Sequence, residues 1–346
     1  MEQSVVIQES TFVKDTLSLS DNSSSTTGNS PSDSPQLGNS PQQQQEEMLA
    51  LLHKQKHIMA HSISSLTSEI TSDEGLMREL HQAKVIIIRH ANSTFNLKWS
   101  QVEKEIKLQA PPEVDPFLSV VSDRDLLDCP LSDLGIKQCE EASATASRLA
   151  NVSAVFISPL RRALQTAYLL FKSHPNFASI NFVIHPHLRE NMHTVCDVPE
   201  DWSVVEEQYR LLFPNLNTSF VQHVSKEGPW YISQLQDPTR TELKATLQSD
   251  VSKHHHDVVM EKVLATYPER VESAYNTNQR VQSFKHFLQG YMENSHGQIC
   301  VVGHSQHFTY MTATKWNSFT EPPVEYRFLA NCEFYPFDKH LTPVDI

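Results

Sequence analysis

Glycine is scarce in this sequence, with only eight glycines among 346 residues. None of them forms the glycine-rich loop that cradles nucleotide phosphates, which argues against a kinase. Basic residues are also few: there are 28 against 41 acidic residues, and the formal net charge is -13. This balance argues against a general nucleic-acid binder, so no nucleic-acid partner is expected.

Cysteines and long apolar runs are also limited. The five cysteines are odd in number and show no paired spacing: Cys129, Cys139, Cys196, Cys300 and Cys332. This favours free thiols in a reducing compartment, with Cys300 as a core thiol. No run approaches the roughly 20 apolar residues of a spanning helix, and the first 15 residues lack a secretory signal pattern. We therefore expect a soluble, cytoplasmic protein without a membrane partner.

The N-terminal part changes character near residue 46. Residues 16–45 are mostly Ser, Asn, Gln, Pro and Thr, which cannot bury enough apolar surface to offset the entropy cost of ordering. We expect a disordered tail over residues 1–45. Apolar residues then recur at helical spacing, which predicts an amphipathic helical segment over residues 46–82. Its expected role is packing against the following domain or a homodimer partner, because its polar face is not notably basic.

Several short apolar runs downstream end abruptly in chemically active side chains. Residues 85–88 lead to Arg89-His90, residues 299–302 to Gly303-His304, and residues 182–184 towards Arg189-Glu190. Residues 154–157 break at Ser158-Pro159 and enter a helix through Arg161-Arg162. Such runs are typical of strands buried on both faces. Open α/β sheets bind ligands at the carboxyl ends of these strands.

Taken in their order along the chain, over about residues 84–310, the four segments resemble the histidine phosphatase superfamily. The family's Arg-His-Gly stretch appears here as Arg89-His90-Ala91. The resemblance implies a phosphoglycerate-mutase-like fold, a three-layer α/β/α sandwich with a mostly parallel central sheet, and the alternation of strands and helices predicts the same. Ala91 in place of glycine would be harmful only if that position required a positive φ.

The resemblance, together with the chemistry of imidazole, assigns His90 as the nucleophile. A neutral imidazole can take up a phosphoryl group covalently. Arg89 disfavours the imidazolium form, and a hydrogen bond from the other ring nitrogen would fix the tautomer. His304 resembles the family's second histidine, a further donor to the phosphoryl oxygens.

Arginines are expected to hold the phosphoryl charge, because their forked donors fit phosphate. Arg89 is one candidate, and the family's pattern before Ala-x-x-Thr-Ala selects Arg162, although Arg161 stays open as its neighbour. Asn96 occupies a position where the family places a polar substrate contact, and the alternative is a plain turn asparagine.

Glu190 occupies the family's acid position. It would protonate the leaving oxygen and later take a proton from water. Asp197 is a weaker substitute. His304 is followed directly by Ser305-Gln306-His307, which include no carboxylate, and this favours Glu190.

We expect a histidine phosphatase domain over residues 83–340, with a cap-like insertion at about 191–267. Residues 97–128, which contain several prolines, are expected to form a loop near the site. Further helices are expected at 163–171 and 271–292, with Ser132 as the N-cap of another, and an edge strand is expected within 326–337. The histidine run 254–256 is interpreted as solvated, because consecutive residues of a regular element cannot all face one ion and no carboxylate lies at ligand spacing.

The function predicted from the sequence is a metal-independent phosphomonoester hydrolase that forms a phosphohistidine on His90, with no cofactor. Its substrate would be a phosphorylated small molecule or a phosphoprotein. One alternative is a phosphoglycerate-type phosphomutase, and another is a non-catalytic scaffold or binding protein that keeps the phosphate pocket.

Overall fold

The computed structural model describes residues 73–106, 115–149, 151–226, 228–250 and 252–342. All of them belong to one unit of the chain, residues 58–346. The tail predicted over residues 1–45 lies outside the described residues, as do positions 46–72 of the predicted amphipathic segment. The remaining part of that segment forms helix α2 (Asp73–Gln82).

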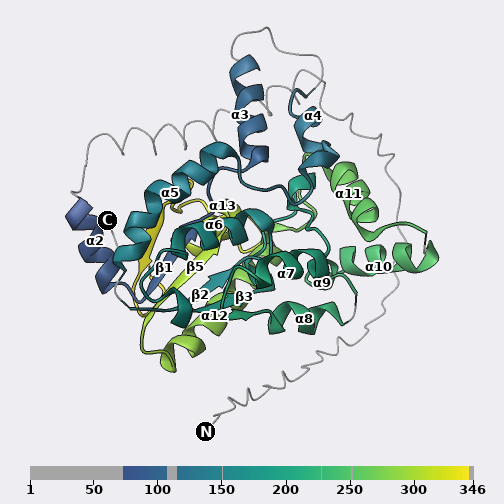
Figure 1. Ribbon diagram of the computed structural model, residues 1–346. Coiled ribbons are helices and arrows are strands. Elements are labelled where there is room, and N and C mark those ends of the chain that lie inside the picture. Colours follow the sequence, from purple (N-terminus) through teal and green to yellow (C-terminus); the bar gives the residue numbers. More distant parts are fainter. Residues whose placement is uncertain (1–72, 107–114, 150, 227, 251, 343–346) are drawn as a thin grey trace, which may run out of the picture. The chain divides into compact units, whose positions relative to one another are not determined.

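Within the described part, six strands form one sheet in the order β4-β3-β2-β5-β1-β6 (Figure 1). The strands are β1 (Val85–Arg89), β2 (Val152–Ile157), β3 (Asn181–Ile184), β4 (Leu216–Asn217), β5 (Gln298–Gly303) and β6 (Phe334–Phe337). Neighbouring strands are parallel, except that β6 runs antiparallel to β1 at the edge. The predicted mostly parallel sheet and its final edge strand are confirmed.

Helices connect and cover these strands. The α-helices after α2 are α3 (Thr94–Ile106), α4 (Leu118–Val121), α5 (Asp133–Arg148), α6 (Arg161–Phe171), α7 (Trp202–Arg210), α8 (Ser219–Ser225), α9 (Trp230–Ser233), α10 (Thr239–Ser249), α11 (His255–Thr266), α12 (Ala274–Glu293) and α13 (Ser305–Met311). Short 3₁₀ helices are η1 (Arg124–Leu126), η2 (Phe177–Ser179), η3 (Pro186–Leu188) and η4 (Val195–Asp197).

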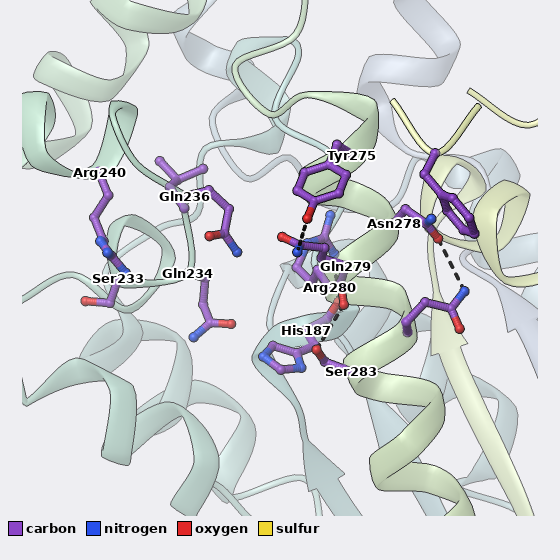
Figure 2. A pocket seen from close by; sticks show the side chains of 13 residues that line it. His187, Ser233, Gln234, Gln236, Arg240, Tyr275, Asn278, Gln279, Arg280 and Ser283 are labelled. Carbon is purple, nitrogen blue, oxygen red and sulfur yellow. Dashed lines mark hydrogen bonds between the residues drawn. The ribbon is translucent and has the colours of Figure 1, made fainter. Parts of the chain in front are cut away.

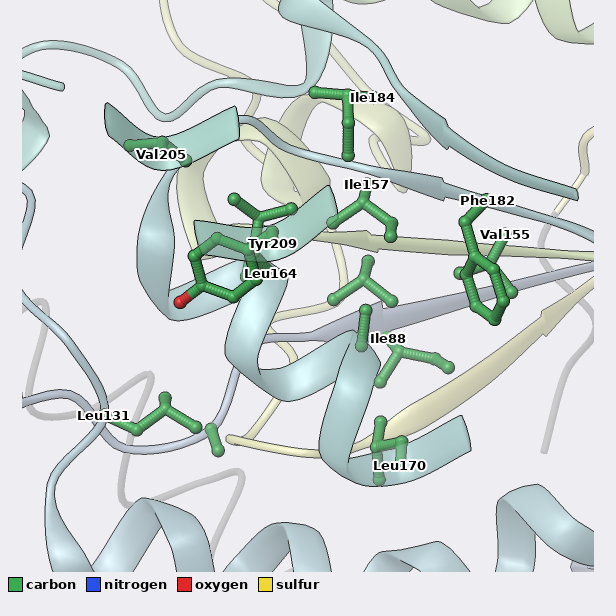
Figure 3. Packing of buried hydrophobic residues seen from close by; sticks show 14 of the residues in the cluster. Ile88, Leu131, Val155, Ile157, Leu164, Leu170, Phe182, Ile184, Val205 and Tyr209 are labelled. Atoms are coloured by element: carbon green, nitrogen blue, oxygen red, sulfur yellow. The ribbon is translucent and has the colours of Figure 1, made fainter. Parts of the chain in front are cut away.

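The sheet is buried on both faces. Successive side chains of β1 point to opposite sides, so Ile86 and Ile88 join the core under α5 and α6, whereas Val85 and Ile87 join the core with α12 and α13. Figure 3 shows the first of these cores, with Leu164 of α6 among the strand residues. Burying one such aliphatic side chain contributes about 1.5–3 kcal/mol. The three-layer arrangement predicted from the sequence is confirmed.

Helix α5 begins close to the end of β1. The Ser132 Oγ accepts a hydrogen bond from the Gly135 N–H at 3.1 Å, which confirms Ser132 as the N-cap. Gly135 permits close packing here, because a Cβ at this position would lie 2.0 Å from the carbonyl oxygen of Asn92. The turn after His90 is therefore packed directly against the start of α5.

The loop predicted over residues 97–128 is wrong in its first part. Helix α3 starts at Thr94, because Ser93 and Asn96 cap it reciprocally: the Ser93 Oγ accepts from the Asn96 N–H at 3.2 Å, and the Asn96 Oδ1 accepts from the Ser93 N–H at 3.1 Å. The prolines lie beyond residue 106 and do not interrupt this helix. Helices α4 and η1 follow.

The region expected to be an insertion, residues 191–267, contains α7 to α11. It also contributes to the sheet, since β4 pairs in parallel with β3 through Phe182 and Leu216. This region therefore extends the sheet edge in addition to forming helices.

Candidate functional site

Three strands bring the predicted residues to one edge of the sheet. The N–H of His90, just past β1, donates to the carbonyl oxygen of Gly303 in β5 at 2.9 Å. The N–H of Ser158, just past β2, donates to the carbonyl oxygen of Val302 in β5 at 3.0 Å. The residues that follow β1, β2 and β5 consequently share one edge, as expected for parallel strands.

His90 is buried, and the tautomer of its ring is fixed. Its Nδ1 lies 2.7 Å from the carbonyl oxygen of Ala91. A carbonyl can only accept, so Nδ1 carries the proton and Nε2 keeps its lone pair. Burial, followed by the charges of Arg162 and Arg89, holds the pKa of His90 well below its usual value. The ring is therefore neutral near pH 7, and its Nε2 can act as a nucleophile.

Ala91 fits where the family carries glycine. The non-glycine residues with positive φ in the described part are Asp128, Cys332 and Leu341, so Ala91 avoids the left-handed region. Its N–H donates to Thr166 Oγ1 at 3.0 Å, which anchors the turn to α6. The one condition under which alanine would be harmful here, a positive φ, therefore does not apply.

His304 lies beside His90, with the two ring centroids 5.0 Å apart. Its Nε2 is 2.7 Å from the Oγ of Ser158. Its Nδ1 is buried and has no hydrogen-bond partner among the described residues. Burial, and then the nearby charge of Arg162, holds the pKa of His304 well below its usual value. The Nδ1 of this neutral, buried ring is therefore available to hydrogen-bond with a bound group.

Arg89 and Arg162 are both held by protein acceptors. Arg89 donates from Nη1 to the carbonyl oxygen of Leu329 at 2.7 Å, while its buried Nε has no partner in the described part. Burial lowers the pKa of Arg89 to about 10. Arg162, which is 3% exposed, donates from Nη1 to the Cys196 carbonyl oxygen at 2.7 Å and from Nη2 to Asp197 Oδ1 at 2.9 Å. Both groups remain cations near pH 7.

Arg161 forms hydrogen bonds with different partners from those of Arg162. Its N–H donates to Asp128 Oδ1 at 2.9 Å, and its Nε donates to the Asp128 carbonyl oxygen at 2.8 Å. Burial raises the pKa of Asp128 to about 6. Arg161 therefore fastens the start of α6 to the segment before α5, and Arg162 is the arginine whose charge acts on both histidines.

Glu190 is connected to the turn after β5. Its Oε2 accepts from the Gln306 N–H at 3.2 Å and from the Ser305 Oγ at 3.3 Å, and its Oε1 accepts from the Asn191 N–H at 2.8 Å. Burial, and then the negative charge of Asp197, raises the pKa of Glu190. A carboxyl group with a raised pKa is suited to proton donation.

The structure does not bring Asn96 into contact with the other five predicted residues. Its side-chain oxygen caps α3, accepting from both the N–H and the Oγ of Ser93 at 3.1 and 3.0 Å. This is a local structural role and corresponds to the turn alternative considered for this residue.

Sequence reasoning missed a buried ion-pair network that supports the Glu190 segment. Glu272 binds Arg189 at 2.9 Å and Arg280 at 2.7 Å, and all three side chains are buried. Although burial opposes ionisation, the two arginines lower the pKa of Glu272 to about 2. Arg280 also donates to the carbonyl oxygens of His187 and Arg189. No spacing in the sequence signals this network, because Glu272 and Arg280 lie over 80 residues from Arg189.

Two further features do not include any of the six predicted site residues. A polar cavity of about 590 Å³ is lined by residues of η3, α9, α10 and α12, including His187 and Gln279 (Figure 2). None of the six predicted site residues lines it. Among the described residues, the groups able to hold a metal ion are formed by His254, His255 and His256 and by Glu200, Asp201 and His256. They share no residue with the predicted site.

The sequence matches the family model described as histidine phosphatase superfamily (branch 1) over residues 124–219. The predicted resemblance to the histidine phosphatase superfamily is confirmed. The matched stretch includes Arg162 and Glu190, whereas His90 and His304 lie on either side of it.

Solved structures with similar folds share little sequence with this chain. Phosphoglycerate mutase from Bacillus anthracis shares 14% identity, covering 77% of this chain and 94% of its own, with a TM-score of 0.39. Mycobacterial glucosyl-3-phosphoglycerate phosphatase shares 15% identity over 73% and 88% of the two chains, with a TM-score of 0.37. Phosphoserine phosphatase from Entamoeba histolytica shares 15% identity over 75% and 93%, with a TM-score of 0.35. Identities and TM-scores this low indicate only a remote similarity of fold.

A search of the curated proteins finds no significant match. Within the residues that the structure describes, no helix has the length and apolar character needed to cross a membrane.

Proposed function

We propose that this chain is a phosphomonoester hydrolase that works through a phosphohistidine on His90 and needs no metal ion for the chemistry. The observation that supports this most strongly is the hydrogen bond from His90 Nδ1 to the Ala91 carbonyl oxygen at 2.7 Å. It leaves Nε2 unprotonated in a ring whose pKa is held low by burial and by Arg162 and Arg89. These are the two properties that a nucleophilic imidazole requires.

In the first step, His90 Nε2 attacks phosphorus, and an N–P bond forms as the P–O bond to the leaving group breaks. The Glu190 carboxyl group gives its proton to the departing oxygen. In the second step, the Glu190 carboxylate takes a proton from water, whose oxygen attacks phosphorus and displaces the imidazole. The raised pKa of Glu190, caused by burial and then by the charge of Asp197, fits the donor step, because the carboxyl group keeps its proton to a higher pH than an exposed glutamate does.

The phosphoryl oxygens need fixed donors in both steps. Arg89 and His304 each carry a buried nitrogen without a partner in the described part, Nε in Arg89 and Nδ1 in His304. Leaving buried donors unsatisfied costs about 1–3 kcal/mol each, which an anion between them would offset. Arg162 adds positive charge, and its Nη1 and Nη2 are held by the Cys196 carbonyl oxygen and by Asp197. The side-chain oxygen of Asn96 caps α3, so its amide nitrogen is the group that remains for a substrate contact.

We propose a phosphorylated small molecule or a phosphoprotein as the substrate. We also propose residues 83–340 as the histidine phosphatase domain.

Phosphate release from an aryl phosphate tests this function, with chelator present throughout. We expect wild type to be active and His90→Ala to lose activity by at least about 10³-fold, because no nucleophile remains. His286→Ala, a change of an exposed histidine on α12, is the matched control and keeps full activity. Equal activity of wild type and His90→Ala, with both proteins folded by circular dichroism, would overturn the proposal.

A further inference from the structure

Three consecutive histidines gather at the start of α11. His254 is the N-cap, with φ -70° and ψ 139°, and the helix begins at His255. Because the N-cap backbone is not helical, the three rings converge, with centroids 4.3 to 4.5 Å apart. Only His254 lies outside the regular helix, whereas His255 and His256 are its first two residues.

Two carboxylates from a distant part of the chain meet these rings. Asp201 Oδ1 lies 2.6 Å from His255 Nε2 and 3.7 Å from His256 Nε2, and Glu200 Oε1 lies 3.9 Å from His256 Nδ1. The Glu200 N–H donates to Asp128 Oδ2 at 3.1 Å, which holds this segment in place. The carboxylates that the sequence did not place at ligand spacing are supplied by the fold.

The second ring nitrogens of His255 and His256 face other groups. His255 Nδ1 lies 2.7 Å from the hydroxyl of Tyr231, and His256 Nδ1 faces Glu200. Both Nε2 atoms therefore point towards Asp201. Histidines that bind metals characteristically have their other nitrogen hydrogen-bonded to a carboxylate or another polar group. His255 meets this condition through Tyr231, and Glu200 Oε1 lies 3.9 Å from His256 Nδ1.

His256 is buried and incompletely satisfied. The residue is only 7% exposed, so the interpretation of a solvated run is wrong for this histidine. Its Nε2 is buried and has no hydrogen-bond partner among the described residues. A buried polar atom without a partner is costly, and here it is directed at a carboxylate 3.7 Å away.

His254 has a different role. Its Nδ1 accepts a hydrogen bond from the backbone N–H of His256 at 3.4 Å, so its Nε2 carries the proton. It caps the helix and is not counted among the ligands.

We propose that His255 Nε2, His256 Nε2 and the Asp201 carboxylate bind a divalent transition metal of the zinc class, with water completing the coordination. Zinc commonly binds imidazole nitrogens together with a carboxylate oxygen, whereas magnesium and calcium prefer oxygen ligands alone. Metal–ligand distances of about 2.1 Å place tetrahedral ligands about 3.4 Å apart. The distances from Asp201 Oδ1, 2.6 Å to His255 Nε2 and 3.7 Å to His256 Nε2, lie within about one ångström of this value, and the two imidazoles close on the ion when it binds. For Nε2 of His255 to bind the metal, the ring proton lies on Nδ1, which then donates to the hydroxyl of Tyr231.

Such an ion would fasten α11 to the segment that follows Asp197, the partner of Arg162. It lies outside the proposed phosphoryl-transfer machinery and takes no part in that chemistry. The inference therefore does not depend on the proposed function.

The test is zinc binding to the full chain without a histidine tag, measured by competition with a chromophoric chelator after prior metal removal. We expect one equivalent of tightly bound Zn²⁺ and no competition from Mg²⁺. Asp201→Asn and His255→Gln should each weaken this binding at least tenfold. His286→Ala, the exposed-histidine control, should bind like wild type. His90→Ala should also bind like wild type, which separates this site from the pair His90 and His304.

Thermal unfolding provides a second readout. Zn²⁺ should raise the midpoint of wild type and of His90→Ala, and should not raise that of His255→Gln. If Asp201→Asn fails to fold, His255→Gln still allows the comparison, because His255 is only half-buried. Absence of tight zinc binding by wild type, or unchanged binding by folded His255→Gln, would overturn the inference.

Discussion

A single backbone carbonyl decides the chemistry available to His90. The Ala91 oxygen accepts the Nδ1 proton within the same turn that follows β1, so the nucleophilic nitrogen is set by local backbone geometry. Burial of the ring, and then the charges of Arg162 and Arg89, lower the pKa of His90 and keep the ring from becoming an imidazolium. Neither effect requires a carboxylate beside the ring, and this leaves Glu190 free to handle the proton of the leaving group.

Glu190→Gln tests that assignment. An amide cannot donate the proton, so hydrolysis of alkyl phosphates should slow by about 10²–10⁴-fold. Aryl phosphates should slow much less, because their leaving oxygen needs little protonation. Steady-state rates over a series of leaving groups give the comparison. An equal loss for both classes would show that Glu190 is not the acid.

At the scale of elements, the site depends on how the end of β3 is joined to α12. Arg189 and Arg280, buried on either side of Glu272, form ion pairs that span this junction, and Arg280 holds the backbone just before Glu190. The network therefore supports the backbone beside Glu190, the proposed acid.

Glu272→Gln should therefore destabilise the fold by about 3–5 kcal/mol, because it leaves two buried arginines without their counter-charge. Glu293→Gln, at the exposed C-terminal end of α12, is the control and should change the free energy of unfolding by less than about 0.5 kcal/mol. Urea denaturation measures both. Similar stability of the two variants would contradict this account of the network.

Element prediction from the sequence succeeded where patterns were local. The apolar run of β1, the Ser132 cap and the length of α12 all follow from neighbouring residues. Helix α3 was missed because its Ser93 and Asn96 cap is a weak signal beside several prolines. The ion pairs of Glu272 and the meeting of Asp201 with His255 join segments far apart in the chain, so only the folded structure brings them together.

For the whole molecule, buried neutral histidines dominate the dependence of stability on pH. Burial, as the largest cause, holds the pKa values of His90, His185, His304 and His307 well below the usual value. Below about pH 6.5 the unfolded chain binds protons that the folded chain does not, so stability falls as the pH falls. Asp128 and Glu190, whose pKa values are raised, act in the opposite direction but are only two groups.

The free energy of unfolding should consequently decrease on acidification from pH 7 to pH 5. Each histidine that stays neutral contributes up to about 1.4 kcal/mol per pH unit. Urea denaturation at stepped pH values measures the slope. A flat profile, or rising stability towards pH 5, would contradict the assignment of these rings as neutral.

Trapping of the phosphoenzyme tests the central claim most directly. Wild type is mixed with an aryl phosphate and quenched in base, where a phosphohistidine survives, and the peptides are analysed by mass spectrometry. The account predicts one phosphoryl group on His90 that is lost on brief acid treatment, and none in His90→Ala. Phosphate release by wild type without any phosphoryl group on His90 under these conditions, or a phosphoryl group on another residue, would contradict it.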